Sequence, residues 1–347
     1  MIVTRTLSAF RQLEAVRQLP LVFVRRLSEL NELMHRLDPK VCLYVNNAAP
    51  NFQLLSWSRA LHVHVNHGES DKISMASNQA KAYDRVFVAG EAAEIRYRRN
   101  LLEFDDSRLV RVGRPQLDLA HPSAISRSER RTVLYAPTWQ GETDAMNYTS
   151  VPVFGVALVS ALAAAGYRVI YKPHPRVATG AEAVAAAHRE IIAMLQRQSV
   201  GFAEAERHVV ELQAPIQQLF ADSDAMICDV SSVGLDWLYL RVDAPIWICD
   251  PRGDRAALLD ASPLAASTDV IDAGAVPGIA ALVDLALRED PRRDDRRRAR
   301  ELCFGELAPG ESTVRFLAAI DEVIERRDEQ LVAVAATHSV QHESEVQ

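Results

Sequence analysis

Short apolar runs, each followed by a polar or glycine-containing loop, recur along the first third of the chain. Runs of four or five such residues bounded by turn residues are typical of buried strands. We therefore expect strands over 41–45, 61–65, 85–88 and 109–112. Loops of this kind at successive strand ends indicate an open parallel sheet, whose ligand-binding loops follow the carboxyl ends of its strands.

A second series of apolar runs begins near residue 133 and alternates with longer segments that have helical patterning. We expect strands over 133–135, 169–171, 208–211, 225–228 and 246–249. We expect helices near 153–165, 181–198, 215–221, 233–241, 278–288, 291–303 and 312–327. This alternation predicts a second doubly wound domain with a parallel sheet.

The two series predict an α/β protein in which two Rossmann-like domains face a central cleft. Residues 119–130 contain His121-Pro122 and the serines Ser123, Ser126 and Ser128, which indicates a linker between the domains. We place an N-terminal domain at 39–125 and a C-terminal domain at 126–330. The end of the chain, 331–347, is expected to be a disordered tail.

Residues 1–38 are expected to be mainly helical, because leucines recur at helical spacing in their second half. Leu21 to Val24 could instead form a short strand. The segment carries Arg5, Arg11, Arg17, Arg25, Arg26 and Arg36. Such a basic segment could lie on an anionic membrane surface, or it could be a packing helix with a solvated arginine face.

Composition narrows the class of protein. The chain has 347 residues and a formal net charge of -7, which argues against a nucleic-acid binder that relies on overall positive charge. Its four cysteines form no Cys-x-x-Cys pair, so we expect free thiols in a reducing compartment. Charged residues interrupt the start of the chain, and no secretory signal is predicted. We therefore expect a cytoplasmic protein.

The loop after 61–65 carries His67 and Gly68. A histidine at the cleft could act as a general base near neutral pH, and a glycine lets a substrate approach the backbone. Asp71 or Glu69 could orient the imidazole.

His62 and His64 alternate with valines, so they share one face of the expected strand. A His-x-His pair of this kind can bind a metal ion. The chain offers no convincing set of further ligands at later strand ends, so we favour structural histidines with satisfied hydrogen bonds.

The segment Lys172–Arg176 directly follows the expected strand 169–171 and reads Lys-Pro-His-Pro-Arg. Lysine and arginine suit phosphate oxygens, and His174 could donate a hydrogen bond to one. A rigid turn with a solvated charged tip is the alternative, but a turn alone does not require a histidine between two prolines. Trp139 could face the cleft or fill the core.

Two expected helix starts could hold an anion. Ser231 and Ser232 stand where a helix begins after the strand 225–228, and Pro309–Thr313 precedes the last helix. Unpaired backbone N–H groups and the helix dipole favour an anion at such a start. The serines could also be helix caps and nothing more.

Taken together, these pieces resemble the CDP-glycerol glycerophosphotransferase family of teichoic-acid and capsule biosynthesis. The matching pieces stand in the family's order as His67–Gly68 with Ser70-Asp71-Lys72, Leu134–Trp139, Lys172–Pro175, Asp229–Ser232, and Gly310 with Ser312-Thr313. The resemblance implies a GT-B-like fold. It also implies transfer of a polyol phosphate from CDP-glycerol, or a related CDP-polyol donor, to an acceptor hydroxyl with release of CMP. The implied acceptor is a lipid-linked or glycan end of a cell-wall or capsule polymer.

The resemblance also implies roles for individual residues. His67 would deprotonate the acceptor, and the implied catalytic set is His67, Asp71 and His174. The residues implied to bind the donor are Gly68, Thr138, Lys172, Arg176, Asp229, Ser231, Ser232, Gly310, Ser312 and Thr313. No cofactor or metal is implied, because helix starts and cations can stabilise the charge of a transferring phosphoryl group.

Two other functions stay open at this point. A GT-B nucleotide-sugar glycosyltransferase or epimerase would have the same fold. A catalytically idle, membrane-associated partner in a polymer-assembly complex would keep the fold without the chemistry. No nucleic-acid partner is expected, whereas contact with the inner face of the cell membrane follows if residues 1–38 bind lipid.

Overall fold

The first four apolar runs form a parallel sheet in the order β3-β4-β5-β6. Its strands are β3 (Val41–Tyr44), β4 (Leu61–His64), β5 (Arg85–Val88) and β6 (Leu109–Arg111). The structure is a computed structural model that describes residues 1–345. Helix α3 (Glu91–Asn100) packs Ala93 and Tyr97 against one face of this sheet. The four expected strands are confirmed to within one residue.

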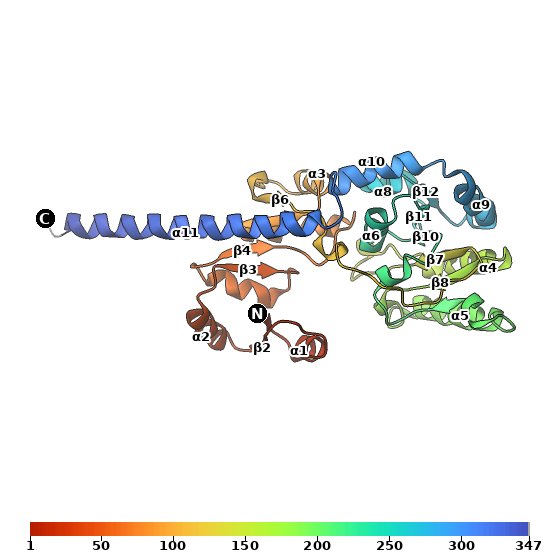
Figure 1. The fold of residues 1–347 in the computed structure, drawn as a ribbon, viewed down its shortest axis with the longest axis horizontal. Helices are drawn as coiled ribbons and strands as arrows, with labels where there is room; N and C mark the ends of the chain where they lie inside the picture. The colour runs from red at the N-terminus through yellow and green to blue at the C-terminus, as the bar shows by residue number, and fades with distance from the viewer. Residues whose placement is uncertain (346–347) are drawn as a thin grey trace.

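Helix α11 (Glu311–Glu345) covers the other face of the first sheet, where Ala319 and Val323 pack against Val63 and Phe87. Figure 1 shows it running along β3 and β4 and extending beyond the sheet. We had expected its first half within the second domain and a disordered tail over 331–347. An apolar stripe predicts that a helix packs, but it does not say against which sheet. The helix continues to Glu345 through good helix formers such as alanine and glutamate, and 346–347 lie outside the described residues.

The second sheet has six parallel strands in the order β12-β11-β10-β7-β8-β9. They are β7 (Thr132–Ala136), β8 (Arg168–Tyr171), β9 (Val209–Val210), β10 (Ala225–Cys228), β11 (Ile246–Cys249) and β12 (Asp269–Ile271). Strand β12 was not predicted from the sequence. Residues of β7, β8, β10 and β11 are buried throughout, as in a sheet covered on both faces.

Helices cover both faces of the second sheet, which makes it doubly wound. One face is covered by α4 (Val156–Ala164), α5 (Glu182–Gln198) and α9 (Ile279–Glu289). The other is covered by α6 (Ser232–Leu240), α8 (Pro263–Ala266) and α10 (Arg293–Phe304), with α7 (Arg255–Ala261) leading into α8. Residues 216–219, expected as part of a helix, form a single 3₁₀ turn.

The N-terminal segment is a small α/β unit rather than a purely helical one. It consists of β1 (Ile2–Thr4), α1 (Leu7–Glu14), β2 (Leu21–Phe23) and α2 (Leu27–Leu37), with β1 and β2 paired in parallel. Helix α2 buries Leu30 and Leu33, whereas α1 buries no residue. Within the described residues, no helix has the length and apolarity needed to cross a membrane.

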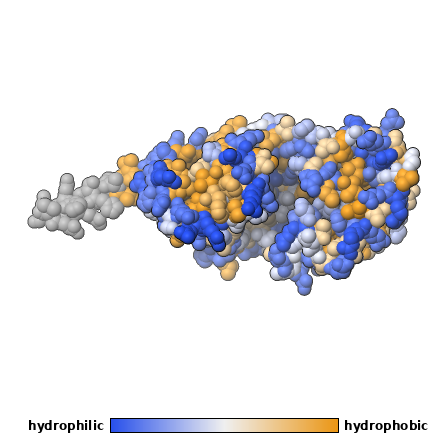
Figure 2. Space-filling model, turned by 90° about the horizontal axis from the view of Figure 1, so that it is seen from below, coloured by the Kyte–Doolittle hydropathy of each residue, from blue (hydrophilic) through white to orange (hydrophobic). Residues whose placement is uncertain are grey.

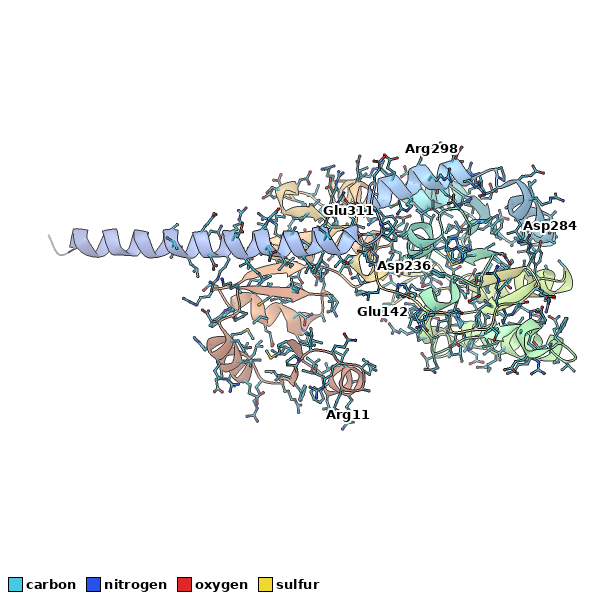
Figure 3. All side chains as sticks on the ribbon, in the orientation of Figure 1. Arg11, Glu142, Asp236, Asp284, Arg298 and Glu311 are labelled. Carbon is cyan, nitrogen blue, oxygen red and sulfur yellow. The ribbon has the colours of Figure 1, made fainter. Side chains whose placement is uncertain are left out.

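Two buried polar clusters join the domains. In the first, Arg114 donates to Asp236 at 2.7 Å, and Gln217 donates to the other carboxylate oxygen at 2.8 Å. Figure 3 shows Asp236 between the two domains. In the second, Asp71 accepts from the hydroxyl of Ser262 at 2.6 Å. The two sheets are therefore held with their carboxyl edges toward one another.

Candidate active site

A cavity of about 560 Å³ lies where the carboxyl ends of the two sheets meet. Figure 2 shows the surface hollowed between the two halves of the molecule. Loops after β3 and β4 form one wall, and loops after β7, β8 and β9 with the start of α6 form the other. Two lysines and three histidines line it, and no carboxylate among the described residues does so. The cavity therefore suits an anion.

His67 is exposed on the wall of this cavity, at the end of β4. Its Nδ1 lies 2.9 Å from the carbonyl oxygen of Val45. A carbonyl can only accept, so Nδ1 carries the proton and Nε2 keeps a lone pair. Asn66, at a φ of 55°, accepts from the backbone N–H of His67 at 2.8 Å and fixes the turn. The imidazole is thus set as a base by a backbone carbonyl.

Asp71 does not orient His67, contrary to the expectation from sequence. Arg96 of α3 donates to Asp71 at 3.1 Å and to Glu69 at 2.6 Å, and all three side chains are buried. The second oxygen of Asp71 accepts from Ser262, 191 residues away in the chain. Asp71 is therefore an interdomain contact, and neither acid lines the cavity.

His174 lines the opposite wall, where the Lys172–Arg176 loop follows β8. The backbone N–H of Arg176 donates to its Nδ1 at 3.1 Å, so in the neutral ring the proton is on Nε2. Although the His174 side chain is exposed, partial desolvation of its ring lowers its pKa to about 4, and the charges of Lys72 and Arg176 add to the effect. At neutral pH this imidazole is therefore an uncharged hydrogen-bond donor, the opposite tautomer to His67.

Trp139 faces the cavity and stacks on His174, with ring centroids 6.0 Å apart. Arg176, expected to bind the donor, lies instead outside the cavity lining. Its guanidinium sits 3.7 Å from the centre of the Trp139 ring and pairs with Glu142 at 2.9 Å. Arg176 thus packs on Trp139, a residue of the cavity wall, without lining the cavity itself.

Lys172 and Lys72 supply the charge of the cavity. Burial lowers the pKa of both lysines. The negative charge of Glu211 opposes this shift at Lys172, and that of Asp229 opposes it at Lys72. Lys72 reaches across from the first domain to within 3.4 Å of the Thr138 hydroxyl, which also lines the cavity. Lys72 stood within a matched motif, but it was absent from the predicted site residues.

The start of α6 opens onto the cavity through Ser231 and Ser232, as expected. The hydroxyl of Ser231 donates to the carbonyl of Asp229 at 3.2 Å, and no described side chain caps the first turn. The backbone N–H groups of the first turn of α6 are therefore available to bind a ligand. Gly68 brings the His67 loop against this helix, because an added Cβ would lie only 3.2 Å from Cβ of Ser232.

Asp229 is buried behind the wall and does not line the cavity, which corrects its expected role in donor binding. Its carboxylate accepts from the backbone N–H groups of Thr138 at 2.7 Å and Ser150 at 3.2 Å. Burial raises the pKa of Asp229 to about 7, although these hydrogen bonds oppose the shift. Asp229 therefore ties the wall at Thr138 to Ser150, which lies further along the same connection between β7 and α4.

Gly310, Ser312 and Thr313 also lie outside the cavity lining. Asp118 accepts from the backbone N–H groups of Gly310 at 3.3 Å and Thr313 at 2.7 Å. Ser312 is fully buried and accepts from the N–H of Arg114 at 3.0 Å. A carboxylate of the protein thus occupies this helix start, and the expectation of donor binding there is not supported by the geometry.

The two histidines of β4 differ from one another. His62 has partners on both nitrogens, the Tyr44 hydroxyl at 2.8 Å and the Trp57 carbonyl at 3.0 Å. His64 lines the cavity, and neither of its nitrogens has a partner among the residues that the structure describes. The expectation that it is satisfied is therefore wrong. No group of three metal-ligating side chains occurs in the part of the chain that the structure describes.

Comparison with known proteins extends this picture. The family described as CDP-glycerol:poly(glycerophosphate) glycerophosphotransferase matches residues 27–251, more than half of the chain. No curated protein sequence matches the chain. A structure of the wall teichoic acid polymerase TagF aligns with a TM-score of 0.58 at 14% identity, over 91% of this chain and 79% of that one.

A second solved structure, UDP-GlcNAc 2-epimerase from Neisseria meningitidis bound to UDP-GlcNAc, aligns with a TM-score of 0.53. It is 9% identical and covers 92% of this chain and 98% of that one. At such identities both structures show the fold alone. The expected GT-B-like fold is confirmed.

Proposed function

Because the chain belongs to the CDP-glycerol:poly(glycerophosphate) glycerophosphotransferase family, we propose that its interdomain cavity transfers glycerol phosphate from CDP-glycerol to an acceptor hydroxyl of a cell-wall polymer. The chain is an enzyme of the glycerophosphotransferase kind. The observation that carries the residue assignment is the pair of hydrogen bonds that favour opposite tautomers of His67 and His174 on facing walls of the cavity. No carboxylate of the described residues lines this cavity.

In the proposed reaction, Nε2 of His67 takes the proton of the acceptor hydroxyl. The acceptor oxygen forms a bond to the phosphorus that carries glycerol. The bond from that phosphorus to the bridging oxygen breaks, and CMP leaves with the electron pair. His67 then gives its proton to solvent. Base, nucleophile and donor are held together, which is the main requirement of phosphoryl transfer.

The opposite wall supplies donors for the diphosphate. His174 offers an N–H from Nε2, Lys172 offers a charge, and the uncapped first turn of α6 offers backbone N–H groups. Groups of this kind, fixed before the reaction, stabilise the charge that develops on the leaving phosphate. A related CDP-polyol would meet the same diphosphate contacts.

CDP-glycerol is expected to raise the thermal midpoint of the protein, because it binds only the folded state. The stabilisation should grow with the logarithm of the ratio of ligand concentration to Kd. Mixing the enzyme with CDP-glycerol and a glycerol-phosphate oligomer should release CMP. A protein that is stabilised by UDP-N-acetylglucosamine and not by CDP-glycerol would contradict the proposed donor.

Replacing His174 with alanine is expected to weaken CDP-glycerol binding by about 10- to 100-fold, the loss of one hydrogen bond to a charged oxygen. Calorimetric titration measures this. Arg189→Ala is the control, because Arg189 lies exposed on α5 and does not line the cavity. Equal affinity in wild type and His174→Ala would remove His174 from the donor site.

We also propose that the N-terminal α/β unit lies on an anionic membrane surface. Helix α1 buries no residue, and Figure 3 shows Arg11 directed away from the body of the protein. Apolar side chains are exposed nearby, with Val16 at 71% and Leu19 at 55% exposure. Arginines beside exposed apolar residues suit the surface of an anionic bilayer.

Sedimentation with vesicles is expected to pull down the protein when they contain phosphatidylglycerol and not when they contain phosphatidylcholine alone. Arg11→Glu with Arg17→Glu should reduce binding by at least tenfold, at about 1 kcal/mol per arginine near the surface. Arg189→Glu, on α5 of the other domain, is the control. Equal sedimentation with both vesicle types would rule out this contact.

A further inference from the structure

His64 is a buried polar side chain on the wall of the active-site cavity. It is the last residue of β4 and is 2% exposed. Neither Nδ1 nor Nε2 has a partner among the described residues. His62 lies on the same face two residues earlier, and both of its nitrogens are satisfied. The strand can therefore hold a satisfied histidine, and His64 differs because it borders the cavity.

Buried polar atoms without partners destabilise a fold, so a native structure that keeps them calls for a reason. A ligand that bonds to the ring would remove this cost in the bound state. Burial lowers the pKa of His64 to about 4, and the nearby His67 adds to the effect. A neutral imidazole has one N–H donor and one acceptor nitrogen. This combination of one donor and one acceptor suits a hydroxyl group, which also donates one hydrogen bond and can accept another.

The ring of His64 is held in place by an aromatic neighbour. It stacks on Tyr83, with centroids 5.0 Å apart and planes at 15°. The Tyr83 hydroxyl donates to Oδ1 of Asn47 at 2.9 Å, and Asn47 lines the same cavity. Both ring nitrogens are shielded from solvent, so binding of a ligand to them requires the wall to move.

The two walls of the cavity differ in the charge of the side chains that line them. Around His64, the wall of the first domain is lined by uncharged polar side chains, namely Asn46, Asn47, Asn66 and Ser74. The groups that suit a diphosphate lie on the other wall, and Lys72 reaches across toward Thr138 of that wall. The two substrates of a transferase thus meet two different surfaces, one uncharged and one cationic.

We propose that His64 binds a hydroxyl of an uncharged polyol or sugar end of the acceptor and positions the reacting hydroxyl beside His67. The proposal rests on the proposed function and adds a specificity-determining residue to it. His64 takes no proton from the reacting hydroxyl, which is the role of His67. Its effect is on acceptor recognition.

The test uses the full chain with CDP-glycerol as donor and a synthetic glycerol-phosphate oligomer with a free terminal glycerol as acceptor. CMP release is measured against the concentration of each substrate. His64→Leu removes both nitrogens and keeps similar volume, whereas His64→Gln restores one donor and one acceptor. His188→Phe is the control, because His188 is also buried beside a tyrosine but does not line the cavity.

His64→Leu is expected to raise the acceptor KM by about tenfold or more, the loss of one or two hydrogen bonds. The donor KM and the affinity for CDP-glycerol should stay the same. The urea midpoint should stay the same or rise, because the variant lacks two unpaired buried polar atoms. His64→Gln should recover most of the acceptor KM. A purely structural histidine would not separate acceptor KM from donor KM in this way.

Three results would overturn the proposal. The first is a folded His64→Leu variant whose acceptor KM stays within twofold of wild type. The second is a wild-type enzyme that binds CDP-glycerol but does not use the oligomer. The third is a wild-type enzyme that does not bind CDP-glycerol at all, and this result alone would also overturn the proposed function.

Discussion

Replacing His67 with alanine is expected to reduce kcat by about 100- to 10,000-fold while CDP-glycerol still binds, which is the usual effect of losing a general base. The base nitrogen is set by one hydrogen bond from Nδ1 to the carbonyl of Val45. The proposed donor contacts come from the opposite wall and stay in place. Turnover is measured as CMP release, and donor affinity is measured by calorimetry.

His67→Asn is the informative companion, because it keeps a polar side chain beside Val45 without a basic nitrogen. It should be as inactive as His67→Ala. His35→Ala, at a histidine on α2 that does not line the cavity, should retain full activity. If His67→Ala supports polymer synthesis in cells and the purified wild type releases no CMP, the chain is a non-catalytic partner and the proposed function is wrong.

Replacing Asp71 with alanine is expected to lower the free energy of unfolding by about 3–5 kcal/mol, because Arg96 would be left as a buried charge with one partner fewer. Arg96 is 8% exposed and Asp71 is 5% exposed, so water cannot replace the lost carboxylate. The contact also joins the domains through Ser262. Urea unfolding measures the loss.

The same variant distinguishes a structural role from a catalytic one. At a temperature where Asp71→Ala stays folded, its kcat should lie within about tenfold of wild type, far above that of His67→Ala. Ser262→Ala removes the hydrogen bond to Asp71 and the helix-cap bond from the backbone N–H of Ala265. It leaves the ion pair of Arg96 and Asp71 in place and should cost about 2 kcal/mol. An Asp71→Ala protein with wild-type stability and no turnover would restore Asp71 to the catalytic residues.

The structure agrees with the sequence analysis wherever neighbours along the chain set the outcome. Apolar runs with polar loops at their ends define nine of the expected strands, and parallel sheets bring those loops to one edge. His67, His174, Ser231 and Ser232 reach the cavity for this reason. The tautomer of His174 is also local, because its partner is the N–H two residues on.

The predictions from sequence were wrong where the hydrogen-bond partner of a residue lies far away along the chain. Asp71 is close to His67 in sequence, yet its hydrogen bond to Ser262 spans 191 residues. Thr313 stands at a helix start that looks suited to an anion, but Asp118 takes that place from 195 residues away. Nothing in the local sequence of α11 or of the His67 loop indicates these partners.

Patterning along the chain was enough to predict two parallel sheets, a cleft at their carboxyl edges and the loops that line it, because strand direction and loop order follow from backbone geometry. The tertiary structure alone decided which helix start stays open, which carboxylates become interdomain contacts and which histidine of β4 is left without a partner. A hydrogen bond depends on distance in space, and burial removes water as the alternative partner. Those outcomes therefore become fixed only when the two domains pack together.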